Sequence, residues 1–231
     1  METEVFSELF PLMSTANPQT LEWLLSMATK HEYPIGRAVL MEDAWGNAVY
    51  FLMSGWVKVR RTVGEDALTL AILGRGDFFG EMAVLDESPR STDVIALSPV
   101  KLLSISRERF IQILFKDPQL HHRMLQLMVR RLRHANMRLQ LRSSPPAVKL
   151  AHTLVNLGEN YGQESHKGKE ILYIPYKDLA DVTEIGVEET TKIMEKLQER
   201  GWLEIDTINQ VVYLINFKQL VNLASKFSLN S

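Results

Sequence analysis

The sequence predicts an α+β protein in which an antiparallel β-roll is followed by a long helix and by a small domain of helices and a hairpin. Short segments rich in Val, Tyr, Phe and Leu alternate with turn residues between positions 38 and 105. Residues 119–142 contain neither Gly nor Pro, and Pro145-Pro146 then breaks the helical pattern. We therefore expect three parts: residues 1–116, 117–142 and 143–231.

Composition limits the function classes. At 231 residues, with 45% hydrophobic and 23% charged side chains, the chain is typical of a globular protein of one large or two modest domains. It has no cysteine, which excludes disulfides, thiolate zinc sites and cysteine-ligated iron–sulfur clusters. The first residues are acidic where a secretory signal is basic, and no apolar run approaches the roughly 20 residues of a membrane span. We expect a cytoplasmic protein without a membrane partner.

The first part begins with helix and continues as strands. Residues 5–29 carry a helical apolar stripe, with Asn17 as the expected N-cap before Pro18. The expected strands are separated by turn signals such as Gly36 and Ser54-Gly55, a spacing that indicates an antiparallel sandwich or barrel-like roll. These strands are Ala38–Met41, Ala48–Met53, Val57–Arg61, Leu68–Leu73, Asp93–Ala96 and Val100–Ile105.

A short helix, Arg107–Phe115, is followed by the long helix Gln119–Arg142. The long helix carries two apolar stripes, one of which forms a heptad seam. We expect the second stripe to pack on the roll and the seam to pair with a second chain, so that residues 117–142 form a dimerisation helix; a single buried helix with two core faces is the alternative. The seam is Leu125, Met128, Leu132, Ala135 and Leu139, and the second stripe is Leu120, Met124 and Leu127.

The last part reads as a winged helix-turn-helix, because two helices around a tight connection precede a two-stranded hairpin. Residues 143–231 hold 9 Lys and Arg against 12 Asp and Glu, a net charge of −3, whereas residues 1–142 hold 17 against 16, a net of +1. The expected elements are the helix Ala147–Leu157, a loop over Gly158–Lys169, the strand Glu170–Ile174, the helices Lys177–Val182 and Val187–Arg200, the hairpin Leu203–Asp206 and Gln210–Leu214, and a helix over Phe217–Phe227.

The segment Gly74–Thr92, GRGDFFGEMAVLDESPRST, has residue types that suit an anionic sugar-phosphate. Gly80 permits a backbone conformation closed to other residues, and the residues after it can open a short helix whose N–H groups face an anion. Arg90 can grip two phosphate oxygens, with hydroxyl donors from Ser91 and Thr92 beside it. Glu81 fits such a ligand only if the ligand also presents a sugar hydroxyl. The alternative is a plain turn with a solvated arginine.

At these residues the chain resembles the cyclic-nucleotide-binding regulators typified by the cyclic-AMP receptor protein and the fumarate-nitrate regulator. The resemblance covers FGEMAVLDESPRST, the strand pair YFLMSGWVKV, the long helix and the winged helix-turn-helix. It implies a β-roll of the cyclic-nucleotide-binding jelly-roll type. It also implies that Arg90 and Ser91 hold the cyclic phosphate, that Gly80 and Met82 present backbone groups, and that Glu81 accepts the ribose 2′-hydroxyl. The candidate walls are Leu70, Leu73 and Ala83.

The resemblance also concerns the base and the DNA. Aligned on Arg130-Arg131-Leu132, the base-contacting positions are Ala135 and Asn136, of which only the amide can bond a base edge. This favours cyclic AMP over cyclic GMP as the effector. Alternatively, Asn136 fixes the helix register. The implied DNA-binding residues are Lys177, Val187, Glu188, Thr190, Thr191 and Lys192, with Thr190, Thr191 and Lys192 facing outward.

The recognition helix departs from the family pattern. Val187 replaces an arginine that pairs with guanine, whereas Glu188 matches a cytosine acceptor and Lys192 stands for a second arginine. The net −3 of the domain disfavours DNA on charge alone. The cations Lys196 and Arg142 can share one face with the lysines of the motif. We interpret the basic face of the long helix, Arg130, Arg131, Arg133 and Arg138, as solvated or salt-bridged, with a contact to the ligand phosphate or DNA as the alternative.

Two functions follow. The first is a cyclic-AMP-responsive transcription regulator, a homodimer whose ligand reorients the helix-turn-helix on double-stranded DNA. The second is a cyclic-nucleotide-binding protein whose acidic winged helix acts through protein partners; RNA polymerase or another family member are the candidates. We expect no enzymatic activity and no metal, because nucleophile-elbow and Gly-Lys-Ser/Thr motifs are missing and the six histidines lack metal-ligand spacing.

Overall fold

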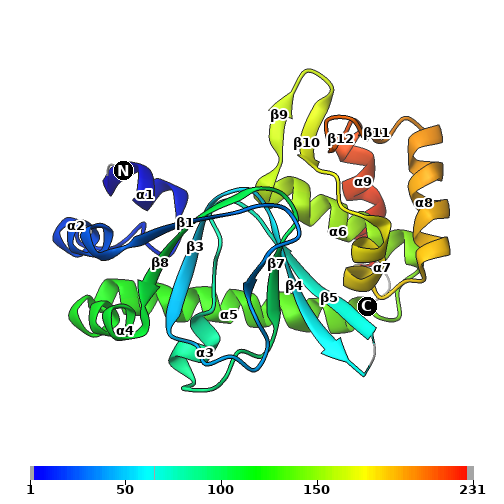
Figure 1. The fold of residues 1–231 in the computed structure, drawn as a ribbon. Coiled ribbons are helices and arrows are strands. Elements are labelled where there is room, and N and C mark those ends of the chain that lie inside the picture. Colours follow the sequence, from blue (N-terminus) through cyan, green and yellow to red (C-terminus); the bar gives the residue numbers. More distant parts are fainter. Residues whose placement is uncertain (1–2, 65, 228–231) are drawn as a thin grey trace. The chain divides into compact units, whose positions relative to one another are not determined.

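The computed structural model describes residues 3–64 and 66–227 (Figure 1). The chain divides between His134 and Ala135 into two compact units. The first unit contains two antiparallel sheets, which confirms the predicted β-roll. One sheet has the strand order β1 (Thr29–Tyr33), β8 (Val100–Ser106), β3 (Ala48–Ser54) and β6 (Phe78–Phe79). The other has the order β2 (Ala38–Leu40), β7 (Asp93–Ala96), β4 (Val57–Val63) and β5 (Asp66–Leu73).

The two faces of the first sheet are buried in different cores. One face meets the second sheet through an inter-sheet core that includes Leu52, Phe79 and Val94. The opposite face packs on helices through Phe51, whose ring centroid lies 5.5 Å from that of Phe6 and 5.2 Å from that of Phe10. Because both faces are covered, the sheet holds its strands in a fixed register. The helices are α1 (Thr3–Leu9), α2 (Pro18–Met27), α4 (Arg107–Lys116) and the first turns of α5 (Pro118–Leu141).

Two side chains cap the helices of this unit. The side chain of Asn17 accepts the N–H of Gln19 at 2.9 Å, as expected for the N-cap of α2. The backbone N–H of Asn17 donates in turn to the carboxylate of Asp117 at 2.8 Å. Asp117 also accepts the N–H groups of Gln119 and Leu120, each at 3.1 Å, and so caps α5. Residues distant in sequence thus fix the beginnings of α2 and α5 against one another.

The second unit contains the last turns of α5 and the elements expected of a winged helix. These are α6 (Pro146–Tyr161), β9 (Gln163–Ser165), β10 (Gly168–Leu172), α7 (Tyr176–Thr183), α8 (Val187–Glu199), β11 (Glu204–Asp206), β12 (Val211–Leu214), α9 (Phe217–Ala224) and a 3₁₀ turn, Ser225–Phe227. The sheet order is β11, β12, β10, β9. Gly158 lets α6 approach α9, since a Cβ there would lie 2.6 Å from the ring of Phe217.

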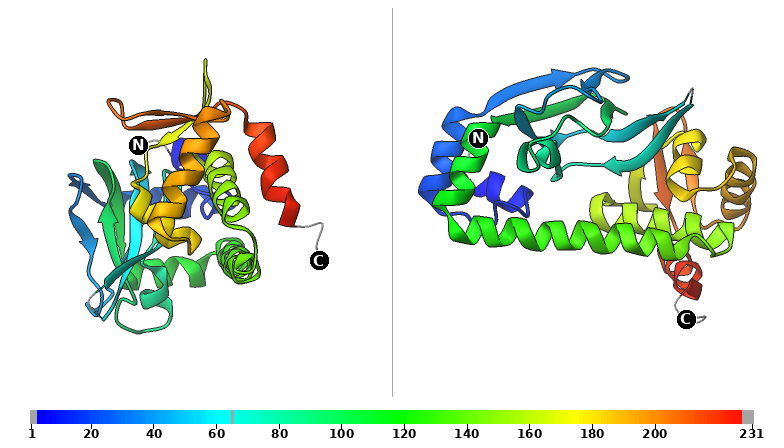
Figure 2. Two further views of the ribbon diagram at one scale, coloured as in Figure 1. Left: turned by 90° about the vertical axis from the view of Figure 1, so that its right-hand side faces the viewer. Right: turned by 90° about the horizontal axis from the view of Figure 1, so that it is seen from below.

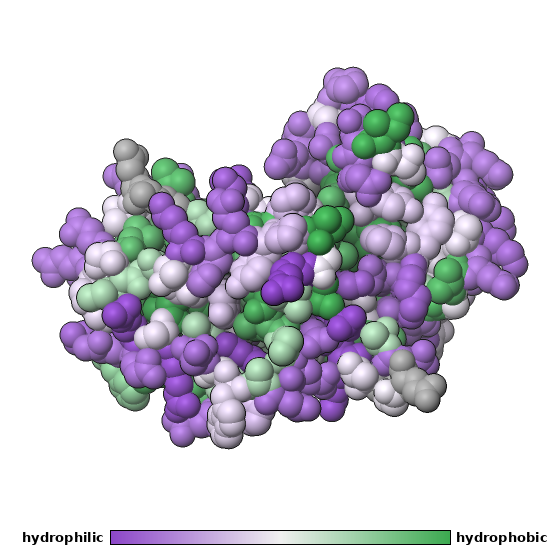
Figure 3. Space-filling model, viewed as in Figure 1, coloured by the Kyte–Doolittle hydropathy of each residue, from purple (hydrophilic) through white to green (hydrophobic). Residues whose placement is uncertain are grey.

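Three strands were not expected: β1, β6 and β9. β1, with the sequence TKHEY, lies at the edge of its sheet and is mostly exposed, so it lacks the apolar alternation of a half-buried strand. β6 has two residues, and β9, QES, is a polar edge strand. The helical pattern expected over residues 5–29, with Asn17 as an N-cap, folds as α1 and α2. On the face of the molecule in Figure 3, apolar side chains are dispersed among hydrophilic ones.

Candidate functional site

The segment singled out by the sequence folds as β6, a left-handed glycine and the short helix α3 (Glu81–Leu85). Gly80 has φ +85° and forms the N-cap of α3. A Cβ at this position would lie 2.6 Å from Nη1 of Arg90 and 3.2 Å from the carbonyl oxygen of Ala48. Both the backbone conformation and the close approach therefore require glycine. The glycine expected for its conformational freedom lies against the arginine expected to hold an anion.

Arg90 is buried, with 5% of its surface exposed. Its Nη1 donates to the carbonyl oxygen of Gly80 at 2.5 Å, and its Nη2 donates to that of Ala48 at 2.7 Å. Burial lowers the pKa of Arg90, while Tyr50 and Glu81 act in the opposite direction, and a guanidinium stays charged at physiological pH. Two carbonyl groups thus fix the cation, and a guanidinium has five N–H donors, so further donors remain for a ligand.

Glu81, which begins α3, is 2% exposed and forms an ion pair with Arg131 of α5. Arg131 also donates from Nη2 to the carbonyl oxygen of Phe78 at 2.6 Å, and its Cζ lies 4.4 Å from the centre of the Phe78 ring. The sequence grouped Arg131 with the basic face of the long helix. Arg131 is salt-bridged, which is one of the two states expected for that face, and its partner is the buried carboxylate of Glu81. The sequence offered one signal for this pair: a basic residue on the long helix, which was expected to pack on the roll.

Two residues beside Arg90 were missed by sequence reasoning. A Cβ at Gly46 would lie 2.7 Å from Cβ of Ala83 and 3.0 Å from Cζ of Arg90, so this glycine allows α3 and the arginine to pack closely. Tyr50 of β3 stacks on Phe79, with ring centroids 5.6 Å apart and an interplanar angle of 6°, and burial raises its pKa. Both residues precede the motif in the chain, and the pairing of β3 with β6 brings Tyr50 to it.

The other predicted ligand residues lie in varied surroundings. Ala83 is buried, whereas Met82 is 64% exposed. Leu73 is half-buried against the inter-sheet core, and Leu70 and Thr92 are also half-buried, while Ser91 is exposed. Ala135 and Asn136 are exposed residues of α5 in the second unit. The structure therefore brings together Gly80, Glu81, Ala83 and Arg90, and the assignment of these and of the other residues to a ligand stays a prediction.

The predicted seam of α5 presents exposed apolar side chains. Leu120 and Met124 are buried in the helix-side core of the roll, which places the second stripe where the sequence expected it. The exposed residues of the seam are Leu125, Leu132 and Leu139, joined by Val129; Ala135 is also exposed, and Met128 is half-buried. Figure 2 shows α5 as one uninterrupted helix. Such a row of large apolar residues is a candidate contact surface.

The turn between α7 and α8 has the expected helix-turn-helix form. Glu184 adopts a left-handed conformation, with φ 54°, at the C-cap of α7, and Gly186 is the N-cap of α8. At the start of α8, Val187, Glu188 and Lys192 are exposed. Lys177, on α7, forms an ion pair with Asp181 at 2.9 Å.

The outward orientation expected of Thr190 is wrong. Thr190 is wholly buried, and its Oγ1 is a buried side-chain oxygen without a hydrogen-bond partner among the residues described. It belongs to the inward stripe of α8, which continues with Ile193, Met194 and Leu197. Thr191 is half-buried, and its hydroxyl donates to the carbonyl oxygen of Val187 at 2.9 Å. Buried in this way, Thr190 has no surface to present to a partner.

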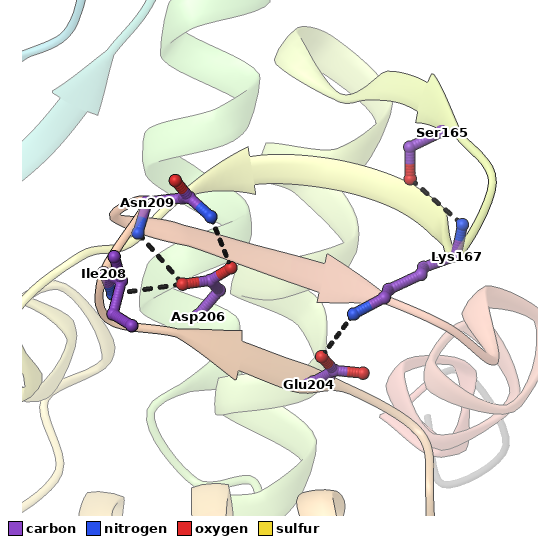
Figure 4. A network of polar contacts seen from close by, with 6 residues as sticks. All are labelled: Ser165, Lys167, Glu204, Asp206, Ile208 and Asn209. Carbon is purple, nitrogen blue, oxygen red and sulfur yellow. Dashed lines mark hydrogen bonds and ion pairs between the residues drawn. The ribbon is translucent and has the colours of Figure 1, made fainter.

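The β11–β12 turn is held by Asp206 (Figure 4). Its carboxylate accepts the N–H groups of Ile208 and Asn209 and the Asn209 side-chain amide, at 2.7–3.0 Å. The Asn209 backbone N–H is the main cause of the lowered pKa of Asp206. Lys167 donates to Glu204 at 2.6 Å, and this hydrogen bond raises the pKa of the lysine. The turn exposes Ile208 and brings no cation of its own to the surface.

Two kinds of feature are absent from residues 3–64 and 66–227. In this part of the chain the structure has no group of three or more His, Cys, Asp or Glu side chains that could hold a metal ion. None of the helices described there is both long and apolar enough to span a membrane.

Comparisons with known proteins match both units. A model of the cyclic nucleotide-binding domain matches residues 30–117, and a model of the Crp-like helix-turn-helix domain matches residues 148–223. The chain is 31% identical to the Cyclic AMP receptor protein of Thermus thermophilus, over 83% of this chain and 87% of that protein.

Two solved structures illustrate the likeness in fold. The Thermus thermophilus Catabolite Activator Protein is 28% identical, with a TM-score of 0.52 over 94% of this chain and 99% of that one. The c-di-GMP-responsive global regulator CLP of Xanthomonas campestris is 24% identical, with a TM-score of 0.68 over 86% of this chain and 99% of that one.

Proposed function

We propose, because this chain belongs to the cyclic-AMP receptor protein and fumarate-nitrate regulator family of transcription regulators, that it is a cyclic-AMP-responsive regulator that binds DNA as a homodimer. Residues 1–116 hold the nucleotide, residues 117–142 pair two chains, and residues 143–231 contact DNA. Ligand binding shifts the dimer towards the arrangement in which both copies of α8 enter the major groove.

The proposal depends above all on one observation: a buried cation and a buried carboxylate meet at Gly80. Arg90 offers charge-assisted donors for a cyclic phosphate, together with the hydroxyls of Ser91 and Thr92. Oε1 of Glu81 is taken by Arg131, so Oε2 is the acceptor for the ribose 2′-hydroxyl. A cyclic nucleotide combines the two groups that this pair would recognise.

The choice of cyclic AMP has support from the chain and from a relative. The amide of Asn136 can both donate to and accept from an adenine edge. The Thermus thermophilus relative is named a cyclic AMP receptor protein. Met82, Ala83, Leu70 and Leu73 complete the proposed ligand surroundings, with Ala135 beside the base.

Isothermal titration calorimetry tests the ligand. We expect cyclic AMP to bind the full chain more tightly than cyclic GMP or cyclic di-GMP. Arg90→Leu should abolish this binding and keep the fold, because it removes the charged partner of the phosphate. Arg75→Leu is the matched control, since Arg75 is an exposed arginine of the same segment. Unchanged affinity of Arg90→Leu contradicts the proposed site.

A second candidate function is favoured by the charge of the second unit. Glu188 and Glu189 are exposed at the beginning of α8, in a region whose net charge from residue 143 onward is −3. Carboxylates near phosphates oppose the electrostatic attraction that supplies non-specific DNA affinity. A cyclic-nucleotide-binding protein that acts through a protein partner is therefore the alternative.

Fluorescence anisotropy of a labelled duplex of arbitrary sequence, at low salt, separates the two functions. We expect the chain to bind the duplex and expect saturating cyclic AMP to change the affinity or its salt dependence. Lys192→Gln should weaken binding by removing a phosphate or base contact. Absence of binding in both states, with nucleotide binding intact by calorimetry, favours the protein-partner function.

The homodimer is tested by sedimentation velocity. Leu132→Glu places a carboxylate in the middle of the seam, where Leu132 is 61% exposed, and should yield monomers. Ile208→Glu puts the same charge on another exposed apolar residue, at the β11–β12 turn, and should leave the dimer unchanged. A Leu132→Glu chain that stays dimeric contradicts the proposed seam.

A further inference from the structure

Two arginines at the end of α5, Arg138 in its last turn and Arg142 directly after the helix, bind the segment between α7 and α8. Nη2 of Arg138 donates to the carbonyl oxygen of Val182 at 3.0 Å. Nε of Arg142 donates to Oε2 of Glu184 at 2.7 Å. Both contacts belong to the second unit, and they end on neighbouring residues: Val182 lies in the last turn of α7, and Glu184 is the C-cap of that helix.

Each contact meets a need of that turn. The last carbonyl groups of a helix have no partner within the helix. Ala180 and Asp181 of α7 accept the N–H groups of Ile185 and Glu184, respectively. The carbonyl oxygen of Val182 instead accepts a hydrogen bond from the guanidinium of Arg138.

The other contact fixes the side chain at the bend. Glu184 has φ 54° and ψ 46°, a conformation that a residue with a Cβ adopts only at a cost of about 1 kcal/mol or more. Its side chain is bound by Arg142, whose own side chain is 65% exposed. Arg138 is more enclosed: desolvation by burial lowers its pKa, and Glu184 acts against that shift.

We propose that Arg138 and Arg142 are positioning residues for DNA recognition, which fix the beginning of α8 to the end of α5 through the α7–α8 turn. The inference rests on the proposed function, because it assumes that α8 contacts DNA. It also gives Arg138 a role other than those considered from the sequence, which were a solvated or salt-bridged side chain and a contact to the ligand phosphate or to DNA. In this role Arg142 does not approach phosphates; it binds a carboxylate that holds the turn.

Glu184→Gln distinguishes this role from an effect of charge. Removing a carboxylate near phosphates should strengthen DNA binding if charge alone matters. If Glu184 is an anchor, its loss should weaken binding roughly tenfold, because a charge-assisted hydrogen bond that orients α8 is lost. The matched control is Glu189→Gln, an exposed carboxylate at the start of α8, which should strengthen binding.

The DNA experiment uses the full chain with cyclic AMP and the arbitrary duplex at low salt. We expect Arg142→Gln and Glu184→Gln to weaken binding to a similar extent, and the charge swap Arg142→Glu with Glu184→Arg to recover most of the loss. Tighter binding by Glu184→Gln, equal to that of Glu189→Gln, overturns the proposal.

Amide hydrogen exchange tests whether Arg138 and Arg142 hold the α7–α8 turn in the free protein, without DNA. The N–H of Ile185 donates to the carbonyl oxygen of Ala180 at the end of α7, and the N–H of Thr190 donates to that of Gly186 at the start of α8. Both N–H groups should exchange several-fold faster in Arg138→Met and Arg142→Gln. Lys169→Gln, which breaks the ion pair with Glu164 in the same unit, should leave them unchanged. If exchange is faster in the two variants but the wild-type chain does not bind DNA, the proposed function is contradicted and the role of the two arginines in holding the turn is supported. If exchange is unchanged in the two variants and the wild-type chain binds DNA, only the role of the two arginines in holding the turn is contradicted.

Discussion

Glu81 and Arg131 form an ion pair between a carboxylate that is 2% exposed and a guanidinium that is 37% exposed. Because the carboxylate is removed from water, its partner compensates most of the cost of burying the charge. The pair also joins α3 of the ligand site to α5, the helix proposed to pair two chains. The stability of the roll and the state of the ligand site should therefore depend on the same arginine.

Arg131→Ala should destabilise the roll by about 2–3 kcal/mol, less than the loss of a partner from a fully buried pair, since Arg131 is partly solvated. Urea unfolding followed by tryptophan fluorescence measures the change. Arg130→Ala is the control, because Arg130 is the exposed neighbour on the same helix and should change stability by less than about 0.5 kcal/mol. Equal effects of the two substitutions contradict the importance of the buried pair.

Gly80→Ala should cost more stability than Gly36→Ala, although the two glycines have φ values of +85° and +80°. At Gly36 an added Cβ meets nothing within 4 Å, so only the backbone conformation opposes it, at about 1 kcal/mol. At Gly80 the Cβ also collides with Arg90. We expect thermal unfolding to report the difference in stability and calorimetry to report a loss of nucleotide affinity for Gly80→Ala alone. Similar results for both would mean that Arg90 moves aside without consequence.

Thr190→Val should stabilise the second unit by about 1 kcal/mol, because it replaces a buried hydroxyl without a described partner by a methyl group of similar shape. Thr190→Ser keeps the hydroxyl and removes a buried methyl group, so it should lower stability. Chemical unfolding of the full chain measures both. DNA affinity should be unchanged in Thr190→Val, and a marked loss would restore the contact that the sequence suggested.

Asp93 should make the roll sensitive to acid. Desolvation tends to raise the pKa of Asp93, but hydrogen bonds from the Glu42 backbone N–H and from Arg60 outweigh it, so the pKa is lowered. A lowered folded-state pKa contributes stability that is present above the unfolded value, about 3.9, and is lost as the pH falls through the folded value. Unfolding free energies measured from pH 5 downward should fall less steeply in Asp93→Asn than in the wild type, with the exposed Asp86→Asn as control. Parallel pH profiles for wild type and Asp93→Asn would exclude this contribution.

Local patterns made much of the fold predictable. The alternation of short strands and turns, the uninterrupted helix and the helix–turn–helix–hairpin order depend on neighbouring residues. Gly80 and Arg90 were found for the same reason, since they lie ten residues apart in one motif whose chemistry suits an anion. The polar edge strands β1 and β9 were missed because a strand exposed at a sheet edge has no apolar alternation to reveal it.

Contacts between distant segments were not predictable in the same way. The pairing of Glu81 with Arg131 depends on how α5 lies against the roll, and four arginines of that helix had equal standing in the sequence. Thr190 is different, because its signal was present. It lies three, four and seven residues before Ile193, Met194 and Leu197, which is the spacing of an inward helical stripe. The resemblance of the motif to DNA-contacting helices outweighed that periodicity.

The carboxylate of Asp117 connects the starts of two helices that are distant in the sequence. It accepts a hydrogen bond from the backbone N–H of Asn17, the N-cap of α2, and it also caps the first turn of α5. Fraying of either helix at this point breaks the hydrogen bond between Asn17 and Asp117, so we expect the two helix starts to open together. The N-terminal helices therefore stabilise the first turn of the long helix. Deleting them from the chain would destabilise the beginning of the surface through which two copies are proposed to meet.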